Sequence, residues 1–193
     1  MFDPENERER FVLKGTGSIS SRGKITTGYL CITAVSTALV CVATMVVQIP
    51  IPLGYAHLGD SFIWLAAYLF DWKAGMFAGG VGSALADLLS GYPQWVLPTL
   101  IIKAVQGFLA AGLVRGKKGE RKLFSVRTLA GIVLSMSEMV MGYVIGGAIL
   151  AGSFASGLAS APGLLLKGIL NCIVFYAAAA ALKKAGAIKE TEV

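Results

Sequence analysis

Six apolar stretches, almost free of charged residues, cover most of the chain and constrain its fold more than any other feature. They span residues 27–49, 58–70, 74–89, 95–114, 129–150 and 164–182. Only 15% of the 193 residues are charged, and the mean hydropathy is +0.71. One helical crossing of a bilayer needs about 20 apolar residues. The sequence therefore predicts an all-α integral membrane protein with six transmembrane helices.

The predicted membrane domain, residues 27–184, is flanked by two short polar segments. Residues 1–26 contain no apolar run of the length found in signal peptides and are expected to form a cytoplasmic arm. Residues 185–193 are expected to form a cytoplasmic tail. Six crossings leave no room for a separate catalytic or nucleic-acid-binding domain, and no catalytic motif or Walker A loop occurs. We expect neither an enzyme nor a nucleic-acid-binding protein, and no cofactor in this chain.

The cysteines give no sign of a metal site. Cys31, Cys41 and Cys172 all fall inside apolar stretches, without a CxxC spacing or a histidine at ligand distance along the chain. They are expected to be small packing residues, and no bound metal is predicted.

The distribution of basic residues predicts the topology. Fifteen of the seventeen lysines and arginines fall in segments that six crossings from a cytoplasmic N-terminus place inside, and the outer segments 51–59, 90–94 and 151–161 contain none. This asymmetry is the pattern of the positive-inside rule. The short stretches 58–70 and 74–89 are compatible with two full helices, a re-entrant hairpin or one interrupted helix. If residues 58–89 crossed the membrane only once, the basic loop at residues 115–127 would lie outside. We therefore expect an even number of crossings and both termini in the cytoplasm.

Four charged side chains are expected inside the membrane helices, namely Asp87, Lys103, Glu138 and Lys167. A charge at the centre of a bilayer costs about 2.5–3.5 kcal/mol on insertion scales, so these groups are expected to face the interior of the bundle. Two cations and two anions could pair as a neutral structural network. They could also line a polar pocket, and the sequence leaves both open.

Helical spacing favours the pocket. Polar and aromatic residues form one stripe on each of three stretches: Trp95, Thr99 and Lys103 on the fourth, Glu138 and Tyr143 on the fifth, and Lys167 and Asn171 on the sixth. Asp87 and Lys167 lie towards the outer ends of their helices, so the pocket is expected to open outward. Aromatic walls that include Trp64 and Tyr92, with a few hydrogen-bonding groups, suit a flat heterocycle of little charge. The same aromatic residues could instead form an interfacial belt.

The outer loop between the first two stretches has the prolines and glycines of a shaped lid. It carries Tyr55 and His57, the only histidine of the chain. Either side chain could close the pocket. A histidine in a loop is also compatible with a plain hydrogen-bonding role at the surface.

Three segments together resemble a known family of membrane proteins. They are Gly59-Asp60-Ser61-Phe62-Ile63, the run GVGSALADLLSGYP at residues 80–93, and PTLIIK at residues 98–103. The combination is similar to the substrate-binding S component of energy-coupling-factor (ECF) vitamin importers. The similarity is clearest over residues 34–103, and the rest of the chain agrees in length and predicted topology.

The resemblance implies a fold and a mechanism. S components have six helices with both termini inside, and they dock on a transmembrane T component through an AxxxA face of the first helix, here Ala34 and Ala38. They capture a vitamin from outside beneath the loop between the first two helices. They then reorient in complex with the T component and two ATPases, which consume the ATP. The chain would be a multi-pass protein of the bacterial plasma membrane, in contact with lipid.

The resemblance is strongest to the subgroup named for riboflavin import, which also contains binders of hydroxymethylpyrimidine and pyridoxine. A small polar pocket favours a pyrimidine or pyridine compound over riboflavin. In this interpretation the hydrogen bonds come from Asp87, Lys103, Glu138, Lys167 and Asn171, the stacking from Tyr92, Trp95 and Tyr143, and the lid from His57 or Tyr55; Thr99 lies in the matching motif. A riboflavin binder, a self-sufficient proton-coupled transporter and a purely structural subunit remain alternatives.

Overall fold

The computed structural model describes residues 26–51, 54–114 and 122–186. Its elements, in chain order, are α2 (Thr27–Val46), β1 (Ile49–Ile51), β2 (Gly54–Ala56), α3 (Gly59–Leu69), α4 (Trp72–Leu89), the 3-10 turn η1 (Pro93–Trp95), α5 (Val96–Val114), α6 (Val126–Ala151), α7 (Phe154–Ala159) and α8 (Ala161–Lys184). The predicted N-terminal arm and C-terminal tail lie outside the described residues, apart from residues 26, 185 and 186.

Each predicted apolar stretch contains a helix, and two elements were not expected. Strands β1 and β2 form an antiparallel hairpin, with Ile49 opposite Ala56 and Ile51 opposite Gly54. The short helix α7 lies in the predicted outer loop 151–161. Within the described residues the fold is therefore helical except for this hairpin, which is a small correction to the all-α prediction.

Four helical segments are long and apolar enough to cross a bilayer: Thr27–Val46, Pro93–Gly112, Val126–Ala151 and Phe154–Lys184. Helix α3, with 11 residues, is about 16 Å long and reaches only half of a 30 Å hydrocarbon core. It ends before Asp71, whose side chain caps α4 by accepting a hydrogen bond from the Ala74 amide at 2.8 Å. The cap shows that the second and third stretches form two separate helices.

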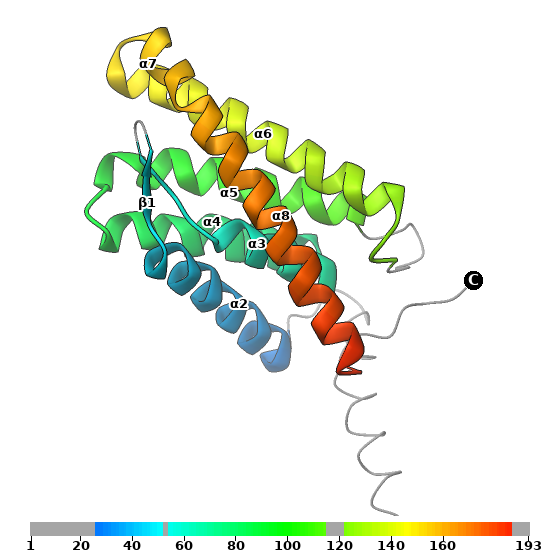
Figure 1. Cartoon of the computed structure of the whole chain (residues 1–193). Helices are drawn as coiled ribbons and strands as arrows, with labels where there is room; N and C mark the ends of the chain where they lie inside the picture. The colour runs from blue at the N-terminus through cyan, green and yellow to red at the C-terminus, as the bar shows by residue number, and fades with distance from the viewer. Residues whose placement is uncertain (1–25, 52–53, 115–121, 187–193) are drawn as a thin grey trace, which may run out of the picture.

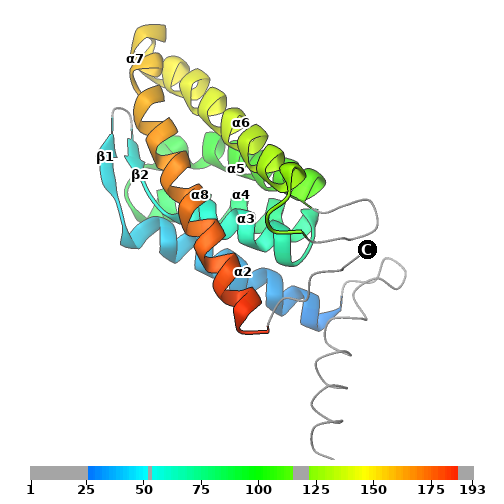
Figure 2. The same ribbon diagram turned by 45° about the vertical axis from the view of Figure 1, so that its right-hand side comes forward.

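The two ends of the bundle differ in what they carry. One end holds the β1–β2 hairpin, the α4–η1–α5 connection and α7 (Figures 1 and 2). The start of α2 and the end of α8 lie together at the opposite end, beside the turn between α3 and α4 (Figure 1). The described ends of the chain therefore share one end of the bundle, as an even number of crossings requires.

An aromatic core holds α3, α6 and α8 together. The indole nitrogen of Trp64 donates to the Ser135 hydroxyl at 2.9 Å, and its ring packs edge-on against Phe175 at 6.3 Å. The sequence left Trp64 as a pocket wall or an interfacial residue. Both are wrong, because the side chain is fully buried in this core.

Helices α4 and α5 approach so closely at Gly107 that a Cβ there would overlap the Gly75 carbonyl. Replacing Gly107 with alanine is expected to force the two backbones apart and to lower the free energy of unfolding by about 1–3 kcal/mol. Thermal unfolding of the detergent-purified protein measures this loss. The control is Gly112→Ala on the same helix, where a Cβ meets nothing within 4 Å. Equal melting temperatures for the two variants would contradict the close approach.

Candidate functional site

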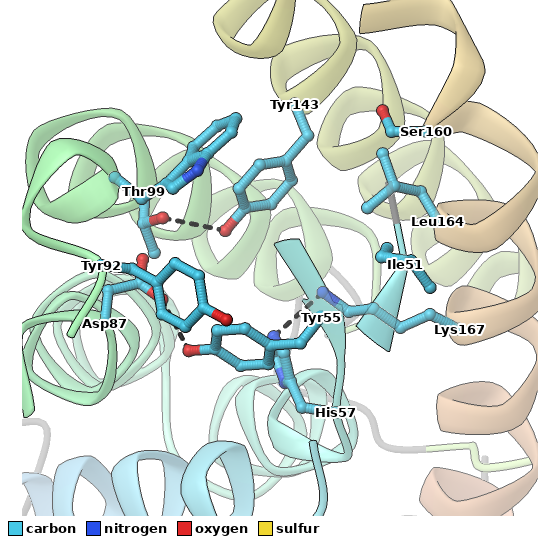
Figure 3. Close-up of a pocket in the computed structure, with 11 residues that line it drawn as sticks. Ile51, Tyr55, His57, Asp87, Tyr92, Thr99, Tyr143, Ser160, Leu164 and Lys167 are labelled. Carbon is cyan, nitrogen blue, oxygen red and sulfur yellow. Dashed lines mark hydrogen bonds between the residues drawn. The ribbon is translucent and has the colours of Figure 1, made fainter. Parts of the chain in front are cut away.

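A pocket opens at the hairpin end of the bundle, with about 450 Å³ of space including its mouth. Its walls come from segments far apart in the sequence, from the hairpin to α8, as Figure 3 shows. The lining residues are Ile51, Tyr55, His57, Asp87, Tyr92, Trp95, Thr99, Tyr143, Ser160, Leu164 and Lys167. Pockets for small ligands commonly combine aromatic walls with a few polar groups in this way.

The end of α4 and the turn after it place Asp87 and Tyr92 on one side of the pocket. Asp87 occupies the last turn of α4, and Gly91 then turns the chain with a φ of 84°, which favours glycine. This turn returns Tyr92 to the pocket, where its ring lies 5.1 Å from that of Tyr55. The Tyr55 hydroxyl donates to Asp87 Oδ1 at 2.7 Å. The hairpin is therefore fastened to α4 across the mouth of the pocket.

Burial and the Asp87 carboxylate both raise the pKa of Tyr55 well above its usual value of 10. The phenol therefore stays protonated and remains a donor at neutral pH.

The aromatic wall opposite the hairpin comes from η1, α5 and α6. The rings of Trp95 and Tyr143 lie 5.5 Å apart at 52°, and the Thr99 and Tyr143 hydroxyls are 3.1 Å apart. The Tyr143 ring also lies 5.4 Å from Lys167 Nζ and 5.3 Å from Lys103 Nζ. It thus separates the open pocket from the charged groups below it.

The basic side is formed by Lys167 and His57. Lys167 Nζ lies 3.0 Å from His57 Nε2, and His57 Nδ1 accepts a hydrogen bond from the Gly59 amide at 3.0 Å. In Figure 3 Asp87 and Lys167 stand on opposite sides of the pocket. The pocket thus offers an acceptor on one side and an N–H donor on the other.

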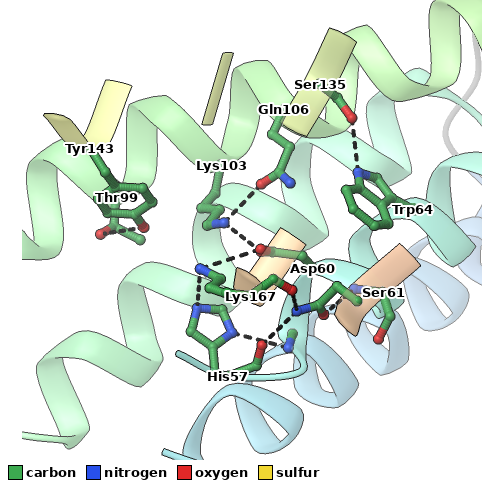
Figure 4. A network of polar contacts seen from close by, with 12 residues as sticks. His57, Asp60, Ser61, Trp64, Thr99, Lys103, Gln106, Ser135, Tyr143 and Lys167 are labelled. Carbon is green, nitrogen blue, oxygen red and sulfur yellow. Dashed lines mark hydrogen bonds and ion pairs between the residues drawn. The ribbon is translucent and has the colours of Figure 1, made fainter. Parts of the chain in front are cut away.

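A buried layer of polar groups lies beneath this pocket (Figure 4). Lys103 Nζ forms an ion pair with Asp60 Oδ1 and a 2.8 Å hydrogen bond with Gln106 Oε1. Lys167 Nζ lies 3.3 Å from Asp60 Oδ2. One carboxylate therefore serves both lysines, and all three charged side chains are at most 2% exposed.

Asp60 is the main omission of the sequence analysis, which considered Asp87 and Glu138 as partners of the two lysines. Both ion pairs are made by Asp60 instead. Asp60 lies in the first turn of α3, at the start of the predicted stretch 58–70. Its position beside the lid loop made it look like part of the loop and not like a charge inside a membrane helix. Its place in the motif Gly59-Asp60-Ser61 was the signal that could have found it.

Asn171 connects the lid to α8. Its side-chain nitrogen donates to the His57 carbonyl at 2.7 Å and to the Lys167 carbonyl at 2.9 Å. Its side-chain oxygen accepts from the Ser61 amide at 2.9 Å. Asn171 therefore fixes the backbone between His57 and Ser61.

Eight of the eleven predicted ligand-binding residues line the pocket: Tyr55, His57, Asp87, Tyr92, Trp95, Thr99, Tyr143 and Lys167. The other three do not. Lys103 and Asn171 belong to the buried layer, and half-buried Glu138 has no hydrogen-bond partner for Oε2 among the described residues. Ile51, Ser160 and Leu164 were missed, because apolar and small residues carry no distinguishing signal in an apolar sequence.

The stability of the protein should depend on the charge of His57. Burial and the neighbouring Lys167 lower the pKa of His57 well below its usual value of 6.5, Lys103 acts in the same direction, and Asp60 opposes them. Since the unfolded chain then binds the proton more tightly, stability present above about pH 6.5 is lost as the pH falls towards the folded-state pKa. We expect the melting temperature to fall more between about pH 7.5 and 5 in the wild type than in His57→Gln. Parallel slopes for the two proteins would contradict the buried neutral histidine.

The comparisons with known proteins agree with this architecture. The family model described as "ECF-type riboflavin transporter, S component" matches residues 24–184. A protein of Pyrococcus woesei, described as an uncharacterized protein in the gap 3' region, is 44% identical over 110 residues, which cover 56% of this chain and 74% of that protein. The thiamine precursor transporter HmpT of Lactococcus lactis subsp. cremoris (strain MG1363) is 32% identical over 126 residues, which cover 64% of this chain and 69% of that transporter.

Proposed function

Because the chain belongs to the family of ECF-type riboflavin transporter S components, we propose that it is the vitamin-binding subunit of an importer that works with a T component and two ATPases. The observation that carries this proposal is the pocket, which lies at one end of the bundle between four aromatic rings, an acceptor and a donor. This family consists of transporter components and not of enzymes. ATP would be used by the partner subunits, and no cofactor is proposed for this chain.

The proposed topology has six crossings of the bacterial plasma membrane, with both termini in the cytoplasm. Two arguments support it. The start of α2 and the end of α8 lie at the same end of the bundle, and the basic residues concentrate in the segments that this topology places inside. Residues 27–184 would form the membrane domain, and the pocket would face the outer side.

The proposed substrate is a small heterocyclic vitamin precursor, with hydroxymethylpyrimidine or pyridoxine favoured over riboflavin. The relative named as a thiamine precursor transporter supports this choice. The eight predicted residues that line the pocket would contact the substrate directly. Lys103 and Asn171 would act through Asp60, Lys167 and His57, which they hold in place.

The proposed docking surface for the T component is the exposed face of α2 that contains Ala34 and Ala38. The opposite face of α2, with Thr33, Thr37 and Val40, is buried against the bundle. Small side chains allow another helix to approach closely in lipid.

Replacing Ala34 and Ala38 together with tryptophan is expected to reduce ATP-dependent uptake at least about tenfold while the vitamin affinity stays within about twofold, because the bulk blocks only the approach of the partner helix. Uptake by proteoliposomes that contain all four subunits measures the first effect, and titration of the isolated chain measures the second. The matched control replaces Val35 and Leu39 together with tryptophan; both residues are exposed on the neighbouring face of α2. A similar loss in both double variants would argue against this docking face.

Reconstitution also separates the proposal from a self-sufficient transporter. Liposomes that contain this chain alone should show no uptake of the vitamin under a proton gradient. Uptake should appear when the T component, both ATPases and ATP are added. Proton-driven uptake by the chain alone would overturn the proposed function.

A further inference from the structure

Only one of the two oxygens of the Asp87 carboxylate has a hydrogen-bond partner among the described residues. Oδ1 accepts the hydrogen bond from Tyr55 at 2.7 Å, and Oδ2 is buried without a hydrogen-bond partner among the described residues. The Thr99 hydroxyl also lies near this carboxylate, but its hydrogen-bond partner is the Tyr143 hydroxyl at 3.1 Å. The side chain is 7% exposed and belongs to the pocket wall. A buried acceptor without a donor is costly, and a carboxylate is the strongest acceptor that a protein offers. The free oxygen therefore calls for a donor on the ligand.

The surroundings of Asp87 restrict what this donor can be. Tyr55 already supplies a hydroxyl on one side, and the ring of Tyr92 lies against that of Tyr55. The aromatic walls admit a flat ring, whose edge then faces the carboxylate. On the other side of the pocket (Figure 3), Lys167 Nζ contacts Asp60 and His57. A lysine ammonium has a third N–H, which can donate to an acceptor on the ligand. A suitable ligand is a flat ring with an N–H donor at one edge and an acceptor at the opposite edge.

The vitamins that the proposed function considers differ in this respect. The pyrimidine edge of a flavin presents an N–H between two carbonyl oxygens, and these oxygens would be repelled by a carboxylate. An aminopyrimidine presents an exocyclic amine next to one ring nitrogen. Its other ring nitrogen, which lies opposite the carbon that carries the amine, can accept from a lysine. The aminopyrimidine therefore fits both sides of the pocket.

We infer that Asp87 selects an amino-substituted nitrogen heterocycle by accepting a hydrogen bond from its exocyclic amine at Oδ2, while Lys167 donates to an acceptor on the far edge of the ring. This inference rests on the proposed function, because it assigns the substrate class of the same pocket. Asp87 is then the residue that discriminates between the amino ring and the same ring with an oxo group in place of the amine.

The experiment titrates the full chain in detergent with 4-amino-5-hydroxymethyl-2-methylpyrimidine and with the corresponding 4-oxo compound, by calorimetry. The wild type should prefer the amino compound by at least about 100-fold, because a site built to accept from a donor rejects an analogue that places an acceptor there. In Asp87→Asn this preference should fall below about tenfold or reverse, since the carboxamide supplies a donor of its own. The matched control is Ser83→Ala, one turn earlier on α4 and outside the pocket, which should keep the wild-type preference.

The outcomes separate this inference from the proposed function. Equal affinities for the two pyrimidines, or tighter binding of pyridoxine or riboflavin by the wild type, would overturn the inference and leave an S component intact. An undiminished amino preference in Asp87→Asn would overturn the role of Asp87. A wild-type protein that binds no vitamin of such a panel would overturn the proposed function as well. If Asp87→Asn does not fold, the ratio of the two wild-type affinities still decides whether the pocket selects the amino ring, and Asp87→Ser is titrated in its place to test the role of the carboxylate.

Discussion

Replacing Asp60 with asparagine is expected to lower the free energy of unfolding by about 3–5 kcal/mol, the largest effect on stability that the structure implies. Asp60 is fully buried and is the carboxylate that contacts both Lys103 and Lys167. The asparagine would leave two buried lysines without an anion, and neither could move into water. Thermal unfolding in detergent should show a melting temperature lower by roughly 10 °C.

Glu138→Gln is the matched control for this prediction. Glu138 also carries a carboxylate inside the bundle, but it contributes to neither ion pair with the lysines. Neutralising it should change the melting temperature by no more than about 2 °C. If Glu138→Gln proves as damaging as Asp60→Asn, the arrangement with Asp60 between the lysines is wrong.

Tyr55→Phe is expected to give the largest effect on ligand exchange, with dissociation of the vitamin about 10- to 100-fold faster than in the wild type. The Tyr55 hydroxyl fastens the hairpin to Asp87 at the mouth of the pocket. A hydrogen bond to a charged group contributes about 1.5–3 kcal/mol, and each 1.4 kcal/mol corresponds to a factor of ten in rate. Stopped-flow displacement, followed by the fluorescence of the pocket residue Trp95, measures the dissociation rate.

Tyr92→Phe serves as the control for Tyr55→Phe. It keeps an aromatic ring beside Tyr55 and leaves the hydrogen bond between Tyr55 and Asp87 in place. Its dissociation rate should stay within about threefold of the wild type. Most of the affinity that a substitution removes appears as faster dissociation, and Tyr92→Phe is not expected to lower the affinity. Similar rates for Tyr55→Phe and the wild type would mean that the hairpin is not the barrier to exit.

The helices could be predicted because hydropathy alone locates apolar segments in a membrane protein. The predicted 129–150 and the observed Val126–Ala151 differ only at their ends, where the cap residue Ser125 and the left-handed Gly152 fix the boundaries. The hairpin could not be predicted in the same way. Its strands have three residues each, and their pairing depends on a contact between the hairpin and α4 that no local pattern encodes.

Helical spacing predicts which face of a helix points to the site, but not how far below the pocket each of its residues lies. The spacing of Trp95, Thr99 and Lys103 predicts one shared face, and all three side chains do contact Tyr143, Trp95 from the end of η1 and the other two from α5. Trp95 and Thr99 line the pocket, whereas Lys103 forms an ion pair with the buried Asp60 carboxylate below it. Which group a buried lysine pairs with depends on the packing of other helices against it. Asp60, supplied by α3, could not be derived from the phase of α5.

The central claim is that the isolated chain binds one small aromatic vitamin precursor in the pocket at the hairpin end. Native mass spectrometry of the purified full chain, with release and identification of any bound molecule and titration with hydroxymethylpyrimidine, pyridoxine and riboflavin, tests it most directly. The account predicts one ligand per chain, with a dissociation constant below about 1 µM for the favoured compound. A protein that stays free of ligand, and gains no thermal stability from any of the three vitamins, would contradict it.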